Sequence, residues 1–543
     1  MKQEEQSIGV RQSAVFLTPE DEKTDHWCRK VLGMTLAVWG VFWTLLPLIL
    51  LEGKYYDVLE NLEWGRYWQF GYDKHPFVSM WISRAVYEVT GSPNWFFLLN
   101  QISVALAVLC VWLLSRRVLR PLPALAASLM TLTLQYFSSW ALEFNNDVIA
   151  VSVWAAAMLF CHRAITGQKI ADWCLTAFFC FIALMTKYYA AVLIGLLGLA
   201  VLCHKTGRKS FRHAGLYCAV LLFLALLLPH ALWLVRSDFL PFKYAMDSSL
   251  SSSELDQMSW IMRNWTVTSS FFRRTLERLV CFIPVFLVLF WKRECPENRM
   301  RRDSFDRFYF TLIALGPLLV TLLPPLLGGM EIKTTWLASC FSLLAVWLFM
   351  VLDPVVTRRR IMLLLAVLGI YAAVLGIERG YAILWRMPYC DRKCNYEAFP
   401  GKAVAEKAEQ IWGEYFRDRP RPLKYVVASR WEAVNVSYFG SSHPRSCFGY
   451  NFCISPWCSP EDLKRCGAIV VWEHTAKRGG GFLNDIPRWF DSFPREKLIM
   501  AGEFEFDRLS RPWFRKHVRR PIRKTRVAFA VLPPQPVTGK NGR

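Results

Sequence analysis

The chain has 543 residues, of which 54% are hydrophobic and 15% aromatic, and it carries a formal net charge of +22 at pH 7. This composition is too apolar for a single soluble domain, and its apolar runs are too long and too many for a soluble core. The basic residues gather in short clusters between apolar runs, which is the pattern of membrane topology and does not favour a nucleic-acid-binding protein.

Residues 1–30 are polar and predict a cytoplasmic N-terminal segment, because the apolar run that follows is too long for the core of a signal peptide. About eleven apolar segments then follow, each a candidate for a membrane-spanning helix. They lie at about 31–51, 96–115, 121–137, 148–161, 171–186, 188–203, 214–235, 279–291, 308–326, 336–352 and 361–378.

The basic clusters test this alternation, because lysine and arginine are enriched in cytoplasmic loops. All six clusters fall on the same side: Arg29/Lys30, Arg116/Arg117/Arg120, Arg163/Lys169, Lys205 to Arg212, Lys292 to Arg307 and Arg358/Arg359/Arg360. The pattern predicts a cytoplasmic N-terminus. On the non-cytoplasmic side it places loops 52–95, 138–147, 236–278 and 327–335, the link at Lys187, and the chain after residue 378.

The first outer loop has an unusual composition. Residues 52–76 follow the first apolar run and contain five carboxylates and six tyrosine or tryptophan rings. Carboxylates beside a membrane are costly unless they face water or a reaction centre, and aromatic rings favour headgroup depth. The stretch therefore predicts a catalytic loop that works on a lipid-borne substrate.

The segment 379–543 has the composition of a soluble α/β domain. A helix-like stretch at 402–416 precedes strand-like runs, and together they predict a periplasmic domain of roughly 150 residues. The predicted strands are 424–431, 468–473, 498–506 and 527–533.

Six cysteines lie in this predicted domain: Cys390, Cys394, Cys447, Cys453, Cys458 and Cys466. An even number on an exported domain predicts disulfides, although the pairing cannot be read from the sequence. A zinc site formed by the last four is the alternative, and it lacks the usual pair of cysteines two residues apart.

A basic stretch lies near the C-terminus of the domain. Residues 508–526 contain nine lysines and arginines and no acidic residue. This stretch is either a solvated charged segment or a patch that holds anionic lipid headgroups or phosphates.

Four groups of motifs, in chain order, resemble a family of bacterial membrane glycosyltransferases. The first outer loop reads Tyr-Asp-Val-Leu-Glu from Tyr56 and Gly-Tyr-Asp-Lys-His-Pro from Gly71, with Phe77 where the family has a second proline. Asn-Asn-Asp ending at Asp147 and Leu-Met-Thr-Lys-Tyr around Lys187 follow. The last group is Pro229 to Trp233 with Asp-Phe-Leu-Pro-Phe after it.

These motifs are similar to those of the protein O-mannosyltransferases and the lipid A aminoarabinose transferase, in glycosyltransferase family 39. The resemblance covers roughly residues 31–350. It implies a membrane all-α fold of the GT-C type, with a catalytic domain at 31–378 and the α/β domain at 379–543. It also implies a polyprenyl-phosphate sugar, such as an undecaprenyl phosphate sugar, as donor.

Sugar transfer of this kind needs a base for the acceptor and cations for the departing phosphate. Asp57 is the expected base, because it best matches the acidic position of the family's first outer loop. The further candidates are catalytic carboxylates and phosphate-binding cations, each with an ordinary surface or structural role as the alternative. They are Asp147, Glu60 and Asp73 for catalysis, and Lys74, His75, Lys187, Arg236 and Arg273 for the donor phosphate.

Other charged residues of the outer loops are weaker candidates. Lys243, Arg263 and Arg274 share the large loop with Arg236 and Arg273, while Glu331 and Lys333 are better explained as a surface ion pair. No histidine or carboxylate spacing makes a metal obligatory, so we expect no metal cofactor, although a divalent ion is not excluded by the sequence.

The sequence thus favours an inner-membrane glycosyltransferase that acts on the periplasmic face. Its partners would be a polyprenyl-phosphate sugar, a lipid acceptor such as lipid A or another envelope glycan, and the surrounding membrane lipids, with no nucleic acid. The alternatives are a protein O-glycosyltransferase and a transporter of lipid-linked sugars. A transporter would be expected to have internal repeats and charges at mid-membrane depth, and neither is evident.

Overall fold

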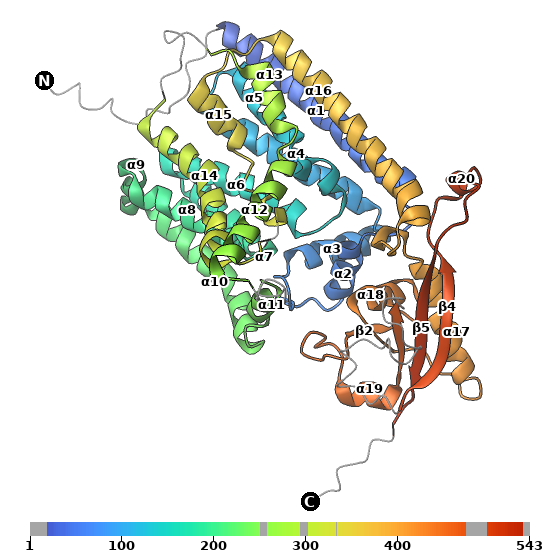
Figure 1. Cartoon of the computed structure of the whole chain (residues 1–543). Coiled ribbons are helices and arrows are strands. Elements are labelled where there is room, and N and C mark those ends of the chain that lie inside the picture. The colour runs from blue at the N-terminus through green and yellow to red at the C-terminus, as the bar shows by residue number, and fades with distance from the viewer. Residues whose placement is uncertain (1–18, 250–257, 294–301, 333, 474–496, 536–543) are drawn as a thin grey trace, which may run out of the picture. The chain divides into compact units, whose positions relative to one another are not determined.

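The structure is a computed structural model that describes residues 19–249, 258–293, 302–332, 334–473 and 497–535 (Figure 1). It divides the chain into two compact units. The helical unit comprises Met1–Leu46, Phe70–Ser79 and Asn94–Gly376. The C-terminal unit comprises Pro47–Gln69, Met80–Pro93 and Ile377–Arg543.

Each of the predicted apolar segments coincides with a helix. The long helices are α1 (Pro19–Leu50), α4 (Trp95–Ser115), α6 (Asn146–Gly167), α7 (Ile170–Thr186), α8 (Ala190–Cys203), α10 (Ala214–Arg236), α14 (Ser304–Gly328) and α16 (Arg358–Tyr381), which continues as the π-helix η7 (Ala382–Cys390). The other helices of this unit are α5 (Pro121–Met130), α9 (Lys205–Arg208), α11 (Leu240–Ser249), α12 (Trp260–Arg278), α13 (Phe282–Phe290) and α15 (Leu344–Leu352).

Six of the described helices are long and apolar enough to cross a membrane, or seven if the bent pair Ala190–Cys203 and Lys205–Arg212 is one span. This finding identifies a multi-pass membrane protein and leaves the predicted number of eleven spans unsupported. The shortfall has a physical reason. The helices α13 and α15 have nine residues each, which is about half the length that a bilayer requires.

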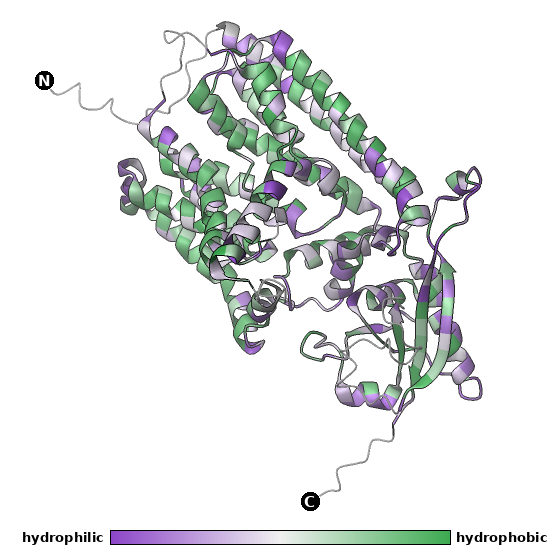
Figure 2. Ribbon diagram, viewed as in Figure 1, coloured by the Kyte–Doolittle hydropathy of each residue, from purple (hydrophilic) through white to green (hydrophobic). Residues whose placement is uncertain are grey.

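The apolar helices differ in how much of their surface other parts of the protein cover. The most apolar window of α6 is 83% buried, whereas those of α1 and α10 are 22% and 11% buried. A helix that is apolar all round is either enclosed by protein or faces lipid. We therefore identify α6 as the centre of the helical unit, and α1 and α10 as helices with lipid-facing surfaces; their ribbons are largely green in Figure 2.

The segment Phe70–Ser79, which carries the Gly-Tyr-Asp-Lys-His-Pro motif, packs on α10 within the helical unit. The ring of His230 hydrogen-bonds the carbonyl of Phe70, and the indole of Trp233 occupies the space that a side chain at Gly71 would need. Only glycine fits at this position, which gives the first residue of the motif a packing role.

The C-terminal unit contains a five-stranded sheet in the order β2-β1-β3-β5-β4 (Figure 1). Strands β2, β1 and β3 are parallel, and β5 runs antiparallel to both β3 and β4. The strands are β1 (Tyr425–Ala428), β2 (Arg445–Phe448), β3 (Ala468–Glu473), β4 (Ile499–Asp507) and β5 (Lys524–Leu532).

The burial of these strands explains their sequences. Strand β1 is buried along its whole length and β3 along all but its last residue, as expected for central strands whose apolar runs are covered on both faces. The sheet is accompanied by α17 (Gly401–Tyr415), α18 (Arg430–Phe439), α19 (Pro460–Cys466) and the short α20 (Pro512–Arg515).

The predicted helix at 402–416 and the four predicted strands are present, and β2 is the strand that the sequence analysis missed. It has only four residues, Arg-Ser-Cys-Phe, between Pro444 and Gly449, and its first side chain is exposed. Such a short stretch has no recognisable alternation, and its strand conformation depends on pairing with β1.

The disulfides predicted from the even number of cysteines are absent, since all six are free. Cys447 and Cys458 are buried together in the apolar core of the sheet, with Cys466 packed beside it, where thiols behave as small apolar groups. Burial also raises the pKa of the Cys394 thiol to about 12, which keeps it protonated. Within the described residues no three histidine, cysteine or acidic side chains are placed to hold a metal ion.

Replacing Gly71 by alanine should destabilise the helical unit by about 1–3 kcal/mol, because the new methyl group meets the Trp233 ring and the ring must move. Thermal unfolding of the purified protein in detergent would measure the change. Gly198→Ala in α8 is the matched control, because no neighbouring atom lies in the way, and it should be neutral or slightly stabilising. Equal melting temperatures for the two variants would contradict this packing.

Candidate functional site

Asp147 lies in the first turn of α6. The preceding Asn145 caps the helix, because its side-chain oxygen accepts hydrogen bonds from the backbone N–H groups of Asp147 and Val148 at 3.0 and 3.2 Å. The local sequence thus begins the helix so that a carboxylate sits at its positive end.

Lys187 lies at the opposite kind of helix end, directly after the last residue of α7. A cation is favoured there by the negative end of the helix dipole. Its ammonium group forms an ion pair with the Asp147 carboxylate at 2.5 Å, and the two side chains are 13% and 25% exposed. The sequence singled out both residues, and the folding of α6 against α7 brings them together.

Aromatic rings surround this ion pair. The Lys187 ammonium lies 5.6 Å from the centre of the Trp336 ring. Tyr189 lies close to both Trp336 and Trp154, stacks on the second of these rings, and hydrogen-bonds the hydroxyl of Thr321. Aromatic rings around a charged group lower the local dielectric constant, so a charge that enters the site interacts strongly with the Lys187 ammonium group.

Both ends of the segment Phe70–Ser79 are linked by hydrogen bonds to residues next to this ion pair. The hydroxyl of Tyr188, next to Lys187, hydrogen-bonds His230, and that ring also contacts the Phe70 carbonyl. At the other end the Ser79 hydroxyl donates to the side chain of Asn146, next to Asp147.

Between these ends lies the predicted cluster Asp73, Lys74 and His75. The backbone N–H of Tyr72 donates to the His75 carbonyl at 2.9 Å and closes the turn. Asp73 is buried, Lys74 and His75 are half-buried, and the Lys74 ammonium lies 6.0 Å from the Tyr244 ring. The structure thus places this cluster and the Asp147–Lys187 pair in one region of the helical unit.

Arg278 is a cation that the sequence analysis did not select. Its guanidinium lies 3.8 Å from the centre of the Trp140 ring and donates to the Gln135 side chain at 2.7 Å. Trp140 packs against Tyr136, whose hydroxyl donates to the carbonyl of Thr334, two residues from Trp336. Contacts between segments more than 100 residues apart create this arrangement, so no local pattern could have revealed it.

The other predicted phosphate-binding cations are more exposed. Arg236 ends α10 and is exposed, Lys243 pairs with Asp238, and Arg263 donates to the Gly329 carbonyl at 3.1 Å. Arg274 and Glu331 are also exposed. Lys333 lies outside the described residues, so the predicted pair with Glu331 is untested.

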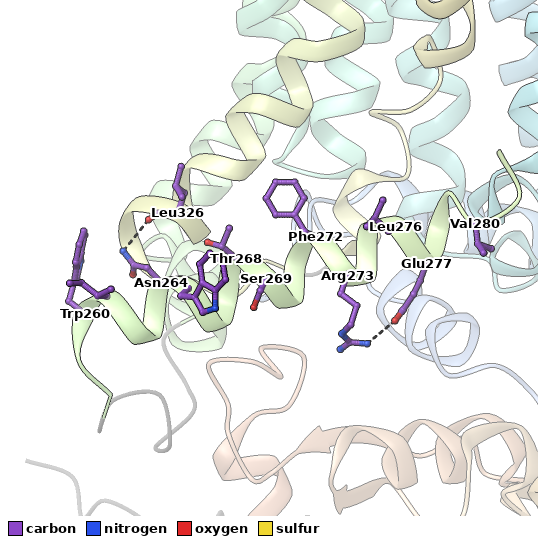
Figure 3. Close-up of a pocket in the computed structure, with 12 residues that line it drawn as sticks. Trp260, Asn264, Thr268, Ser269, Phe272, Arg273, Leu276, Glu277, Val280 and Leu326 are labelled. Carbon is purple, nitrogen blue, oxygen red and sulfur yellow. Dashed lines mark hydrogen bonds and ion pairs between the residues drawn. The ribbon is translucent and has the colours of Figure 1, made fainter. Parts of the chain in front are cut away.

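Arg273 lines a groove of about 1020 Å³ that runs along α12 (Figure 3). Within it Arg273 pairs with Glu277 at 2.7 Å, and Asn264 donates to the Leu326 carbonyl at 3.0 Å. The remaining lining is mostly apolar: Trp260, Ile261, Trp265, Phe272, Leu276, Val280 and Leu326. The groove therefore offers a long apolar surface with one charged pair.

Asp57 and Glu60, the other two predicted catalytic carboxylates, belong to the C-terminal unit. The stretch expected to be a loop contains the helix α2 (Tyr56–Gly65), and α3 (Val78–Thr90) follows. Asp57 lies in the first turn of α2, near the positive end of the helix dipole. Glu60 is buried, accepts a hydrogen bond from Tyr56 at 2.9 Å, and pairs with Arg430 of α18 at 3.3 Å.

The strongest attachment of α2 is a residue that the sequence analysis passed over, Glu63. Its buried carboxylate accepts hydrogen bonds from the Ser437 hydroxyl at 2.6 Å and from the Ser446 backbone N–H at 3.1 Å. Arg66 and Tyr67 donate to the same carboxylate at 2.9 and 3.2 Å. Burial raises the pKa of Tyr67, and Glu63 raises it further, so the phenol stays protonated and can donate.

Stacked rings add to this attachment within the C-terminal unit. Tyr67 stacks on Trp457 with ring centres 4.5 Å apart, and Tyr56 stacks on Tyr396 at 5.0 Å. The helix that carries Asp57 is therefore fixed to the sheet domain at both of its ends.

The chain is similar to known proteins in both sequence and fold. Residues 74–233 match the sequence profile of the family described as dolichyl-phosphate-mannose-protein mannosyltransferase. Over 208 residues the chain is 26% identical to the lipopolysaccharide core galacturonosyltransferase RgtA of Rhizobium johnstonii, a match that covers 38% of this chain and 42% of that protein. The chain thus spans less than half the length of this curated relative.

The fold is similar to that of ArnT from Cupriavidus metallidurans, solved as a complex with undecaprenyl phosphate. The TM-score is 0.58 at 13% sequence identity, and the alignment covers 92% of this chain and 98% of that one. The apo structure of the same ArnT aligns over the same shares at 14% identity with a TM-score of 0.46.

These findings confirm the predicted resemblance: the chain has the fold of a membrane glycosyltransferase of the GT-C class, of the type that ArnT and the protein mannosyltransferases represent. The match begins at Lys74 and includes His75, Asp147 and Lys187. Asp57, Glu60 and Asp73 precede it.

Replacing Glu63 by alanine should destabilise the C-terminal unit by at least about 2 kcal/mol, because the buried Ser437 hydroxyl and Ser446 N–H lose their acceptor, and the half-buried Arg66 and Tyr67 lose one as well. Denaturant unfolding of the purified protein would measure the difference. Glu88→Ala in α3 is the matched control, since that carboxylate is 48% exposed and pairs only with a neighbour on its own helix, and it should cost less than about 0.5 kcal/mol. Similar unfolding midpoints for both variants would contradict the role of Glu63.

Proposed function

We propose that this protein is an inner-membrane glycosyltransferase that moves a sugar from a polyprenyl phosphate, such as undecaprenyl phosphate, to a lipid acceptor on the periplasmic face. The acceptor would be lipid A or another envelope glycan. The observation that carries the proposal is the Asp147–Lys187 pair beside the segment Phe70–Ser79, in a chain with the fold of ArnT.

The donor phosphate needs positive charge where it departs, and Lys187 supplies a half-enclosed ammonium group among aromatic rings. When the bond between the anomeric carbon and the phosphate oxygen breaks, the phosphate gains negative charge, and Lys187 can exchange part of its contact with Asp147 for this new anion. Lys74 and His75, on the adjoining turn, are the next cations that we assign to the phosphate, and Arg278 is a further one.

The acceptor oxygen attacks the anomeric carbon and loses a proton as the new glycosidic bond forms. We assign this proton to Asp57, a half-buried residue in the first turn of α2, and name Asp147 as the alternative base. Asp73 lies on the turn that carries the phosphate cations, and Glu60, with its pairing to Arg430, has the contacts of a residue that positions α2. No step in this scheme is routed through a metal ion.

The apolar groove along α12 supplies a surface for the polyprenyl chain of the donor. Its tryptophan, phenylalanine and leucine side chains match an isoprenoid tail, and Arg273 with Glu277 marks a polar point along it. The names of the relatives support both a lipopolysaccharide acceptor, in the case of RgtA, and a protein acceptor, in the case of the mannosyltransferase family. We prefer the lipid acceptor, in keeping with the lipopolysaccharide core that RgtA's name gives, and keep the protein acceptor as the alternative.

Mass spectrometry of lipid A and of the remaining lipopolysaccharide tests this proposal. Cells with the intact gene should contain a species heavier by one sugar, and a deletion strain should lack it. Asp57→Asn should lower the amount of this species at least about 100-fold, because general base catalysis contributes roughly that factor. Asp418→Asn, in the exposed turn after α17, is the control and should leave it unchanged.

The outcomes separate the alternatives. Loss in the deletion strain but not in Asp57→Asn, with Asp147→Asn inactive, would keep the acceptor and assign the base to Asp147. An unchanged lipopolysaccharide in the deletion strain would contradict the lipid acceptor, and the loss of glycans from exported proteins in that strain would establish the protein O-glycosyltransferase instead.

A further inference from the structure

Residues 508–523 of the basic stretch form an excursion between the two antiparallel strands β4 and β5, and its last three residues begin β5 (Figure 1). Its cations fall into two groups. Some pair with carboxylates of the same unit: Arg515 with Asp507 at 2.8 Å, and Lys524 and Arg526 with Glu505 at 3.3 and 3.0 Å. These pairs stabilise the ends of the two strands. The second group consists of the exposed cations at the tip, Lys516, Arg519 and Arg520.

The base of the excursion is attached to the end of one membrane helix. Arg508 is buried, and its guanidinium donates to the carbonyls of Met387, Asp391 and Arg392 at 2.7–2.9 Å. These carbonyls lie at the C-terminal end of the apolar helix that runs over Arg358–Cys390. Arg523 closes the excursion on the same helix end, with its backbone N–H on the Pro388 carbonyl at 3.0 Å.

A second membrane helix ends beside the beginning of α20. Arg511 donates to the carbonyl of Leu48 at 2.5 Å and pairs with Glu52 at 2.9 Å. The apolar run of α1 ends at Leu51, and its length of roughly 30 Å matches the hydrocarbon core of a bilayer. Arg511 therefore lies at the boundary between hydrocarbon and headgroups, and α20 starts there.

The tip that follows combines an exposed ring with exposed cations. Trp513 is 45% exposed, and Lys516, Arg519 and Arg520 are exposed as well, with Arg520 also contacting the Cys390 thiol at 3.6 Å. Tryptophan prefers the membrane interface, and lysine and arginine near the surface are attracted to anionic lipids.

We propose that the excursion 511–520 is a membrane-surface anchor: Trp513 inserts at headgroup depth, and Lys516, Arg519 and Arg520 bind the headgroups of anionic phospholipids. The anchor ties the sheet domain to the bilayer next to the ends of α1 and η7. This role is separate from sugar transfer and does not depend on which acceptor the enzyme uses.

Photo-crosslinking of the full-length protein in nanodiscs tests the anchor. Two nanodisc preparations are compared, and both consist mainly of phosphatidylcholine. One contains a minor fraction of phosphatidylglycerol with a photoreactive headgroup, and the other contains the same fraction of phosphatidylcholine with that photoreactive group. Mass spectrometry then measures the crosslinks on peptides that cover 511–520. We expect several-fold more crosslinking to phosphatidylglycerol, because each cation near the surface favours anionic lipid about 5-fold.

Three variants make the test specific. The triple substitution Lys516→Gln, Arg519→Gln and Arg520→Gln should reduce crosslinking to phosphatidylglycerol to the level of phosphatidylcholine. Trp513→Ala should reduce crosslinking to both lipids. The matched control is Arg417→Gln, Arg419→Gln and Arg421→Gln in the exposed turn after α17, which removes the same charge and should change nothing.

Two results would overturn the proposal. Equal crosslinking to the two headgroups in the unmodified protein would show that the cations do not select anionic lipid. Displacement of the crosslink by lipid A, at concentrations where phosphatidylglycerol has no effect, would assign the cations to an acceptor phosphate in place of the bilayer. All the substituted residues are exposed, so unchanged melting temperatures would verify that the variants are folded.

Discussion

The ion pair between Asp147 and Lys187 is the interaction on which the candidate site depends. Two charges beside apolar helices are costly unless each has a partner, and here each also lies at the helix end whose dipole favours it. The pair fixes the end of α6 against the end of α7, and the Phe70–Ser79 segment is attached to the residues on either side. Arriving phosphate would meet a cation that is already held in place, which is the arrangement that electrostatic catalysis requires.

The first outer loop is shared between the two units, and this division explains its composition. Its residues from Tyr56 to Gly65 form the helix α2, which Glu60 and Glu63 attach to the sheet domain. Its Gly-Tyr-Asp-Lys-His-Pro part belongs to the helical unit and packs on α10. The carboxylates of the loop therefore differ in their contacts. Glu60 and Glu63 are buried and attach α2, Asp73 is buried in the turn of the helical unit, and Asp57 lies in the first turn of α2.

The sequence predicted the membrane helices and four of the five strands, because apolar periodicity is a local property of the chain. It selected Asp147 and Lys187 separately, but their pairing required the packing of two helices. Arg278, Trp336 and Glu63 were not selected because their contacts join segments far apart in the chain. The predicted number of about eleven spans is not confirmed for a related reason: nine-residue apolar helices such as α13 resemble spans in composition but are too short to count as spans by length.

The central claim is that Lys187 receives the donor phosphate, and the most direct test is equilibrium binding of undecaprenyl phosphate to the purified full-length protein. Lys187→Met should weaken binding at least about 10-fold, since a charge-assisted contact of roughly 1.5–3 kcal/mol is lost. Asp147→Asn should retain binding, because the lysine remains, and Lys205→Met on the exposed turn after α8 should bind like the unmodified protein. Undiminished binding by Lys187→Met would contradict the assignment and move the phosphate to the cations of the neighbouring turn or to Arg278.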